Sequence, residues 1–286
     1  MWFLLLFDLL FSNHYDSSIG KYTIEIYDGK INDIPELINV INNEANKLIT
    51  TLGKIKKEDF SIYITNSLEK FNTMAGPVPE WGIAIAKKNP NIIIMQSPSV
   101  AKISYSRFIK VLKHEINHIY MFNIPKYETI PSWFKEGMAM YFSKEFSLLH
   151  KIKISQHLWK NNIIPLKQIK FINKKNNVTL QYAESAAAIE SLIFYYGKDI
   201  ILKIFNNLHS NQNFKAALEN AINEDYTKFE EKFINFLNNN YKWVFLLKAG
   251  KYIYVILPFI LTLGFYYKNF KNKKILKKWE LEELEN

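Results

Sequence analysis

Alternating apolar and polar residues near the N-terminus predict the strands of a sheet. Residues 22–27 (YTIEIY) and 61–65 (SIYIT) alternate in this way and are rich in β-branched and aromatic side chains. Between them, residues 34–52 carry apolar side chains at helical spacing. Residues 81–86 and 91–95 predict a hairpin, because a turn-forming Lys-Lys-Asn-Pro sequence joins them. The pattern therefore predicts a strand–helix–strand start followed by a hairpin.

From residue 104 onward the apolar spacing is almost wholly helical. Residues 106–121 predict an amphipathic helix with polar side chains on the opposite face. Its apolar face is formed by Phe108, Ile109, Leu112, Ile116 and Ile119. We therefore predict an α+β domain over residues 21–241, in which a small N-terminal mixed sheet (21–103) precedes a helical part (104–241).

The N-terminal segment, residues 1–20, is apolar at its start. It begins with MWFLLLFDLLF, which has the length of a signal peptide but lacks a positive start and is interrupted by Asp8. We predict a signal peptide or an N-terminal apolar segment here. A strand or helix packed on the domain is the alternative.

Residues 249–267 predict a transmembrane helix. Tyrosines lie near both ends, as in an interfacial aromatic belt, although the uncharged part, 252–267, would extend only about 24 Å as a helix. A buried core helix is the alternative, because the hydrocarbon core of a bilayer is about 30 Å thick. Six lysines follow within residues 268–278. The positive-inside rule therefore predicts a single-pass membrane protein with an extracytoplasmic domain and a cytoplasmic tail at 268–286.

The composition limits the possible partners. Of the 286 residues, 48% are hydrophobic and 22% are charged, as in a folded chain. There is no cysteine, so neither a disulfide nor a cysteine-type zinc site is available. The net charge of +10 comes almost wholly from scattered lysines, and no basic run is interleaved with aromatic residues. We therefore expect no nucleic-acid partner, and we expect the lipid bilayer to be a partner of the C-terminal helix.

The strongest chemical signal is the sequence His114-Glu115-Ile116-Asn117-His118. On a helix, H-E-x-x-H places two imidazoles one turn apart, with the carboxylate about 100° round the axis from the first. This geometry predicts one wall of a cleft, in which both imidazoles converge on a metal ion and a carboxylate lies close by.

A second helix offers a third metal ligand. Pro131-Ser132 predicts its start, with Ser132 as the N-cap, and Glu136 then shares a face with Trp133 and Met140. An ionised carboxylate on an apolar face requires a metal or another cation beside it. Glu136 is therefore the predicted third ligand, and a salt bridge to a lysine is the alternative. The next candidates for the third ligand are Glu128, Glu145 and Glu184.

These motifs resemble those of the gluzincin metallopeptidases. Within that group the chain is most similar to the peptidase-MA-like domain proteins, in which a W-x-x-E-G-x-A string like residues 133–139 follows the histidine helix. The resemblance implies one zinc ion per chain, held by His114, His118 and Glu136. It also implies that Glu115 is the general base.

The resemblance has further consequences for the site. It implies an oxyanion donor downstream of the glutamate helix, for which Tyr182 is the candidate. Residues 81–84 are the candidate edge strand for pairing with an extended peptide, and an ordinary internal strand is the alternative. Met140 stands where some gluzincins place an aspartate that orients a histidine, so another group must orient that histidine here.

The sequence therefore predicts a membrane-anchored zinc metallopeptidase that hydrolyses peptide bonds of a peptide or protein substrate. The alternative is a non-catalytic, membrane-tethered binding module that retains a zincin fold. Glu115 counts against this alternative, because a module that only binds metal has no use for a base. Arg107, Lys110 and Lys113 on the histidine helix argue strongly against an intramembrane protease.

Overall fold

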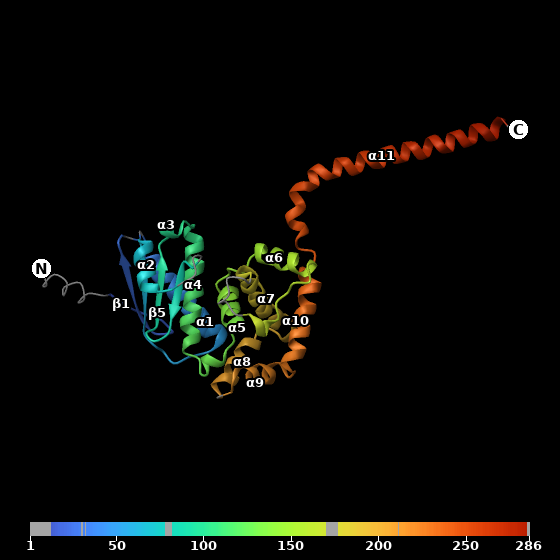
Figure 1. The fold of residues 1–286 in the computed structure, drawn as a ribbon. Helices are drawn as coiled ribbons and strands as arrows, with labels where there is room; N and C mark the ends of the chain where they lie inside the picture. Colours follow the sequence, from blue (N-terminus) through green and yellow to red (C-terminus); the bar gives the residue numbers. More distant parts are fainter. Residues whose placement is uncertain are drawn as a thin grey trace.

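The N-terminal half of the molecule is built on a mixed sheet with the strand order β1-β2-β3-β5-β4 (Figure 1). The computed structural model describes residues 13–29, 31, 33–77, 82–169, 177–210 and 212–284. The three inner strands are parallel, and the two edge strands are antiparallel to their neighbours. The strands are β1 (His14–Asp16), β2 (Lys21–Tyr27), β3 (Phe60–Thr65), β4 (Ala84–Lys87) and β5 (Ile92–Gln96). The predicted mixed sheet is confirmed.

The start of the domain differs from the prediction. Residues 14–16 form β1, which pairs with β2, so the folded part begins before residue 21. Residues 1–12 of the predicted signal segment, and Trp81 of the predicted edge strand, lie outside the described residues. The sequence did not indicate β1, because its three residues are too few to show an alternating pattern.

Helices cover both faces of the sheet. One face packs on α1 (Ile34–Leu52) and α4 (Tyr105–Phe122), and the other packs on α2 (Leu68–Ala75). The period of two residues in β5 explains this, because Ile93 belongs to the large core while Ile94 packs against α2. A short helix, α3 (Pro98–Ala101), connects β5 to α4. The sheet thus supports α4, the helix with the H-E-x-x-H sequence.

The second half is helical, as predicted. Its central contact joins α5 and α7, and Gly137 makes that contact possible: a Cβ atom at Gly137 would lie 2.3 Å from the carbonyl oxygen of Ser185. Trp133 is fully buried and packs against the rings of Phe214 and Phe229. The helices are α5 (Ser132–Phe142), α6 (Leu148–Trp159), α7 (Val178–Tyr196), α8 (Ile200–His209), α9 (Phe214–Ile222) and α10 (Tyr226–Tyr241). Two 3₁₀ helices, η2 (Tyr127–Thr129) and η3 (Leu166–Gln168), lie in the connections.

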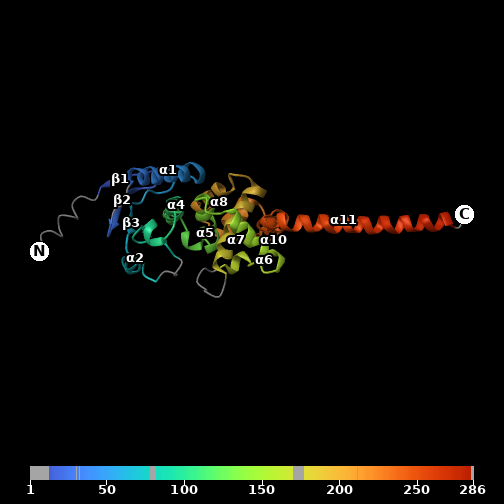
Figure 2. The ribbon, with the colours of Figure 1, turned by 90° about the horizontal axis from the view of Figure 1, so that it is seen from above.

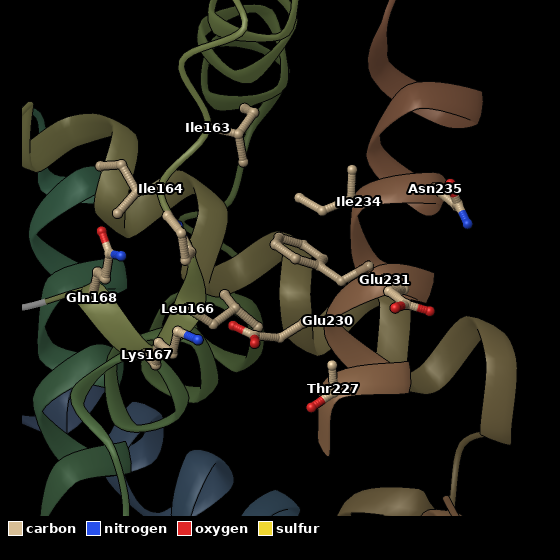
Figure 3. Close-up of a pocket in the computed structure, with 12 residues that line it drawn as sticks. Ile163, Ile164, Leu166, Lys167, Gln168, Thr227, Glu230, Glu231, Ile234 and Asn235 are labelled. Atoms are coloured by element: carbon tan, nitrogen blue, oxygen red, sulfur yellow. The ribbon is translucent and has the colours of Figure 1, made fainter. Parts of the chain in front are cut away.

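An apolar pocket of about 670 Å³ lies between η3 and α10 (Figure 3). Ile163, Ile164 and Leu166 line it on one side, and Phe233 and Ile234 line it on the other. None of the predicted metal ligands or catalytic residues lines this pocket. The pocket is therefore separate from the site predicted from the sequence.

The last helix, α11 (Leu246–Leu284), extends away from the domain in both views (Figures 1 and 2). It includes the predicted transmembrane segment 249–267, but in the part of the chain that the structure describes no helix is both long enough and apolar enough to cross a membrane. The alternative of a buried core helix is wrong. Six apolar side chains between Leu257 and Phe265 are 51% to 68% exposed.

Candidate metal centre

Helix α4 carries the two histidines of the predicted site. The Ser104 hydroxyl begins the helix by accepting a hydrogen bond from the Arg107 N–H. Ile116 is fully buried in the core, which fixes the helix against rotation. The rings of His114 and His118 lie one turn apart on the face towards α5, with their centroids 4.9 Å apart.

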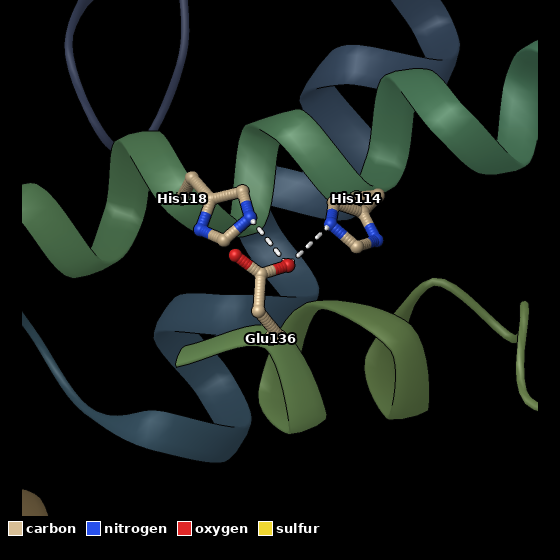
Figure 4. Close-up of side chains that lie close together, drawn as sticks. All are labelled: His114, His118 and Glu136. Atoms are coloured by element: carbon tan, nitrogen blue, oxygen red, sulfur yellow. Dashed lines mark ion pairs between the residues drawn. The ribbon is translucent and has the colours of Figure 1, made fainter. Parts of the chain in front are cut away.

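Helix α5 brings Glu136 to both imidazoles (Figure 4). Glu136 Oε2 lies 3.3 Å from His114 Nε2 and 3.5 Å from His118 Nε2. The ligand atoms of these three residues all lie within 4.8 Å of one another. The structure therefore brings the three predicted ligands together. The start of α5 differs by one residue, because Ser132 is its first helical residue and Pro131 takes the N-cap position without a side-chain hydrogen bond.

The ligand set fits a metal such as zinc. Two imidazole nitrogens and one carboxylate oxygen face a common point from two helices, and three protein ligands of this kind leave one position for water or substrate in tetrahedral coordination. The three side chains are only 11%, 12% and 20% exposed, so the surrounding protein fixes their orientation. This donor set also suits other divalent ions.

The pKa values of Glu136 and His114 shift in opposite directions. Burial would raise the pKa of the Glu136 carboxyl, but His118 and His114 outweigh burial and hold it well below its usual range. Burial would lower the pKa of His114, but hydrogen bonds with Glu136 and Glu145 outweigh burial and hold it well above its usual range. Without a metal, the ionised Glu136 carboxylate therefore faces a positively charged imidazole, and a bound metal ion would displace that imidazole proton and take over its positive charge.

Glu145 supplies the orienting group that the sequence left open. It lies in the segment after α5, where the Ser143 hydroxyl accepts a hydrogen bond from its backbone N–H. Its Oε2 lies 2.7 Å from His114 Nδ1, and because a carboxylate only accepts, Nδ1 carries the proton and donates. That proton position leaves Nε2 of His114 free to bind a metal.

The other candidate ligands lie elsewhere. Glu128 has an 80% exposed side chain that pairs with Lys88, and Glu184 accepts a hydrogen bond from the Ile164 N–H. Glu145 contacts His114 on the nitrogen opposite to the cluster. The structure therefore supports Glu136 over all three alternatives.

Glu115 and Tyr182 lie within electrostatic reach of the cluster. Burial raises the pKa of the Glu115 carboxyl, and the neighbouring His114 and His118 offset only part of this increase. The Glu136 carboxylate, followed by burial and by Glu115, raises the pKa of the Tyr182 hydroxyl, which places Tyr182 within electrostatic reach of the site. The role of Tyr182 as an oxyanion donor stays a prediction.

Strand β4 provides an open sheet edge near the site. It pairs with β5 on one side, it is the last strand of the sheet, and it packs against α4. Of the predicted pairing strand at residues 81–84, only Ala84 belongs to β4; residues 82 and 83 precede the strand, and Trp81 lies outside the described part of the chain.

Comparison with known proteins finds a match to one protein family and matches to solved structures of low sequence identity. The model of a protein family described as the Peptidase MA superfamily matches residues 41–239, which is more than half of the chain. No curated protein matches the chain.

The solved structures that match are distant in sequence. An M1 zinc metallopeptidase from Deinococcus radiodurans is 11% identical, with 79% of this chain and 50% of that chain covered and a TM-score of 0.46. A variant from the same organism, bound to a Tyr-Ser-Ala substrate, has the same identity and coverage and a TM-score of 0.48. An aminopeptidase N family protein from Idiomarina loihiensis is 13% identical, with 79% and 41% covered and a TM-score of 0.44. The chain spans about half the length of the M1 structures that it matches.

Proposed function

The chain belongs to the peptidase MA superfamily, and from this premise we propose that it hydrolyses peptide bonds with one zinc ion held by His114, His118 and Glu136. One observation carries the proposal. Two imidazoles and a carboxylate, from helices that the sheet and the core hold in place, converge within 4.8 Å, and a buried carboxylate that is not part of the cluster lies beside them. The gluzincin type of metallopeptidase has this His-His-Glu ligand set.

The roles follow from the position of each side chain. Zinc, when bound, would supply a Lewis acid that polarises the scissile carbonyl and lowers the pKa of a water molecule. Glu115 accepts a proton from the attacking water and passes it to the leaving amine. Its raised pKa brings the carboxyl closer to neutral pH, where a base that must also act as an acid works best. Tyr182 donates a hydrogen bond to the oxyanion.

Strand β4 is the proposed binding edge for the substrate. An extended peptide that adds to this edge gains backbone hydrogen bonds, which recognise a peptide without regard to its sequence. Because β4 packs against α4, such a peptide passes beside the histidine helix. The proposed substrate class is therefore an extended segment of a peptide or protein.

The test combines metal content with peptide cleavage. We expect near-stoichiometric zinc in the wild-type protein and its loss in His118→Ala and Glu136→Ala, measured by elemental analysis. Glu115→Gln should retain zinc and lose about 1,000-fold in the rate of cleavage of an unstructured protein such as casein, since general-base catalysis contributes about 100- to 10,000-fold. Glu128→Gln, at an exposed glutamate, is the matched control. If the wild-type protein binds zinc but cleaves no peptide, and Glu115→Gln behaves in the same way, the result would instead favour the non-catalytic binding module.

We also propose that residues 249–267 hold the chain at a lipid bilayer, with the domain on the extracytoplasmic side and the lysine-rich tail in the cytoplasm. The exposed apolar side chains of α11 support this proposal, because they have no protein surface against them in the described part of the chain. The six lysines that follow support the orientation. Carbonate extraction of cell membranes tests it: the chain should stay in the pellet, and its release into the supernatant would exclude the anchor.

A further inference from the structure

A row of aromatic rings leads from the metal centre towards the end of β4. The ring of His118 stacks on Phe122 with centroids 6.5 Å apart, and Phe122 meets Tyr127 edge to face at 5.2 Å. Burial and then the Glu136 carboxylate raise the pKa of the Tyr127 hydroxyl, so Tyr127 lies within electrostatic reach of the ligand carboxylate. Tyr127 therefore borders the site on the side of His118.

Two lysines from different elements meet at the Tyr127 ring. The ammonium nitrogen of Lys135, on α5, lies 4.0 Å from the ring centroid, and that of Lys88, just after β4, lies 4.9 Å from it. Cation–π contacts of this kind hold both side chains at the ring. Both ammonium nitrogens therefore lie within 5 Å of the centre of the same ring and within electrostatic reach of each other, next to the proposed substrate strand.

Two carboxylates, those of Glu128 and Glu136, lie within electrostatic reach of Lys135, but neither forms a close ion pair with it in the described part of the chain. Lys88 lies 3.7 Å from Glu128, whose side chain is 80% exposed, and an ion pair so exposed is weak. Lys135 makes no ion pair within the described ranges of the chain. The charge of the neighbouring Glu136 is directed at the two imidazoles. One ammonium group is therefore left without a carboxylate of its own.

Helix stability does not explain a lysine at position 135. It lies in the first turn of α5, where the helix dipole favours a negative side chain and disfavours a positive one. The first turn contains no acidic residue, and Pro131 gives no side-chain cap. The backbone N–H groups of that turn add further positive potential at the same place.

We propose that Lys88 and Lys135, held at the Tyr127 ring, form a subsite for a carboxylate of the peptide substrate on the His118 side of the metal centre. This inference rests on the proposed peptidase function and on binding along β4. Lys88 directly follows β4, so a peptide extended along that strand runs towards the lysine pair. The path from the His118 ring through Phe122 and Tyr127 to the ammonium groups corresponds to no more than about five residues of peptide at about 3.4 Å per residue, so the carboxylate lies within about that distance of the scissile bond.

A carboxylate can come from an acidic side chain or from the C-terminus of the peptide, and matched peptides distinguish the two. We would use alanine-rich peptides of eight residues with one Asp or Asn moved along the sequence, each made as free acid and as C-terminal amide. The full chain loaded with zinc should cleave the best Asp peptide with a kcat/KM about 5-fold above its Asn partner, the value of one partly exposed ion pair. If the C-terminal carboxylate is the ligand, the free acid will exceed the amide instead.

Variants assign the preference to the lysine pair. Combining Lys88→Gln with Lys135→Gln should abolish the preference, Lys135→Arg should retain it, and Lys110→Gln, the same charge change at an exposed position of α4, should also retain it. No preference in the wild type, or the same preference in the double variant, would overturn the subsite.

A binding measurement separates this inference from the proposed catalysis. Calorimetry with the same peptides in the Glu115→Gln background does not depend on cleavage. If no peptide is cleaved by the wild type, the peptidase function fails, and equal binding of the acidic and neutral peptides then overturns the subsite too. Tighter binding of the acidic peptide, lost when Lys88 and Lys135 are replaced, supports the subsite even in that case.

Discussion

Two glutamates with little or no exposure, Glu136 on α5 and Glu184 on α7, lie on helices that pack against each other, yet their carboxyl groups behave in opposite ways. Glu136 faces two imidazoles, which hold its pKa well below the usual range. Glu184 is fully buried and accepts hydrogen bonds from the Ile164 N–H at 3.2 and 3.3 Å, and burial raises its pKa to about 8. Burial alone therefore makes a carboxylate costly, and it is the facing imidazoles that keep Glu136 ionised, as the proposed metal ligand must be.

Replacing each glutamate by glutamine keeps the size of the side chain and removes only its charge. The comparison therefore predicts a different loss at each position. The substitution should lower the affinity for the metal strongly at Glu136 and more weakly at Glu145. At Glu184 it should remove a contribution to stability that depends on pH. Glu145 is the intermediate case, because it touches one imidazole on its outer nitrogen.

The largest effect is expected for Glu136→Gln. The affinity for zinc should fall by more than about 100-fold, because losing a direct ligand exceeds the 10- to 100-fold loss that is typical of residues that only orient a ligand. Competition with a chelating dye measures this affinity. Glu128→Gln should leave it unchanged, and an unchanged affinity in Glu136→Gln would place the third ligand elsewhere.

The cluster of His114, His118 and Glu136 was predictable from the sequence because it depends on local geometry. An i, i+4 pair of histidines shares a helix face wherever that helix lies, and Glu136 stands out as a charge among buried apolar neighbours such as Trp133 and Met140. The mixed sheet followed for a similar reason, since alternation along β2 and β3 marks strands directly.

Other features depend on packing that the sequence does not show. Glu145 lies in an irregular segment beyond α5, and it reaches His114 only because α5 packs against α4. In the sequence it was therefore one of several possible ligands. Strand β1 forms because β2 offers a free edge, and Lys88 meets Lys135 only when the β4–β5 turn approaches α5.

The second effect is a change in the pH dependence of stability for Glu184→Gln. The folded protein keeps a proton on Glu184 up to about pH 8, whereas the unfolded chain releases it near the ordinary value of 4.5. The free energy of unfolding of the wild type therefore falls as pH rises between these values, by up to about 1.4 kcal/mol per pH unit. Glutamine has no proton to release, so the variant lacks this contribution.

Urea unfolding of the metal-free protein at pH 5, 6 and 7 measures the difference. Between pH 5 and 7 the wild type should lose about 2 kcal/mol more than Glu184→Gln, because a single proton is involved. Titration of His114 and Glu136 affects both proteins equally and cancels in the comparison. Parallel curves for the two proteins would show that Glu184 is ionised in the folded state.

The smallest effect is expected for Glu145→Gln. The glutamine side-chain oxygen can still accept a hydrogen bond from the Nδ1–H group of His114. It lacks the negative charge that raises the pKa of His114, so this pKa should fall in the metal-free protein. NMR titration of the histidine measures this shift. Zinc affinity should fall by about 10-fold, the lower end of the range for residues that orient a ligand. A loss as large as that of Glu136→Gln would make Glu145 a direct ligand. No loss at all would show that the packing of α4 and α5 orients His114 without a carboxylate behind it.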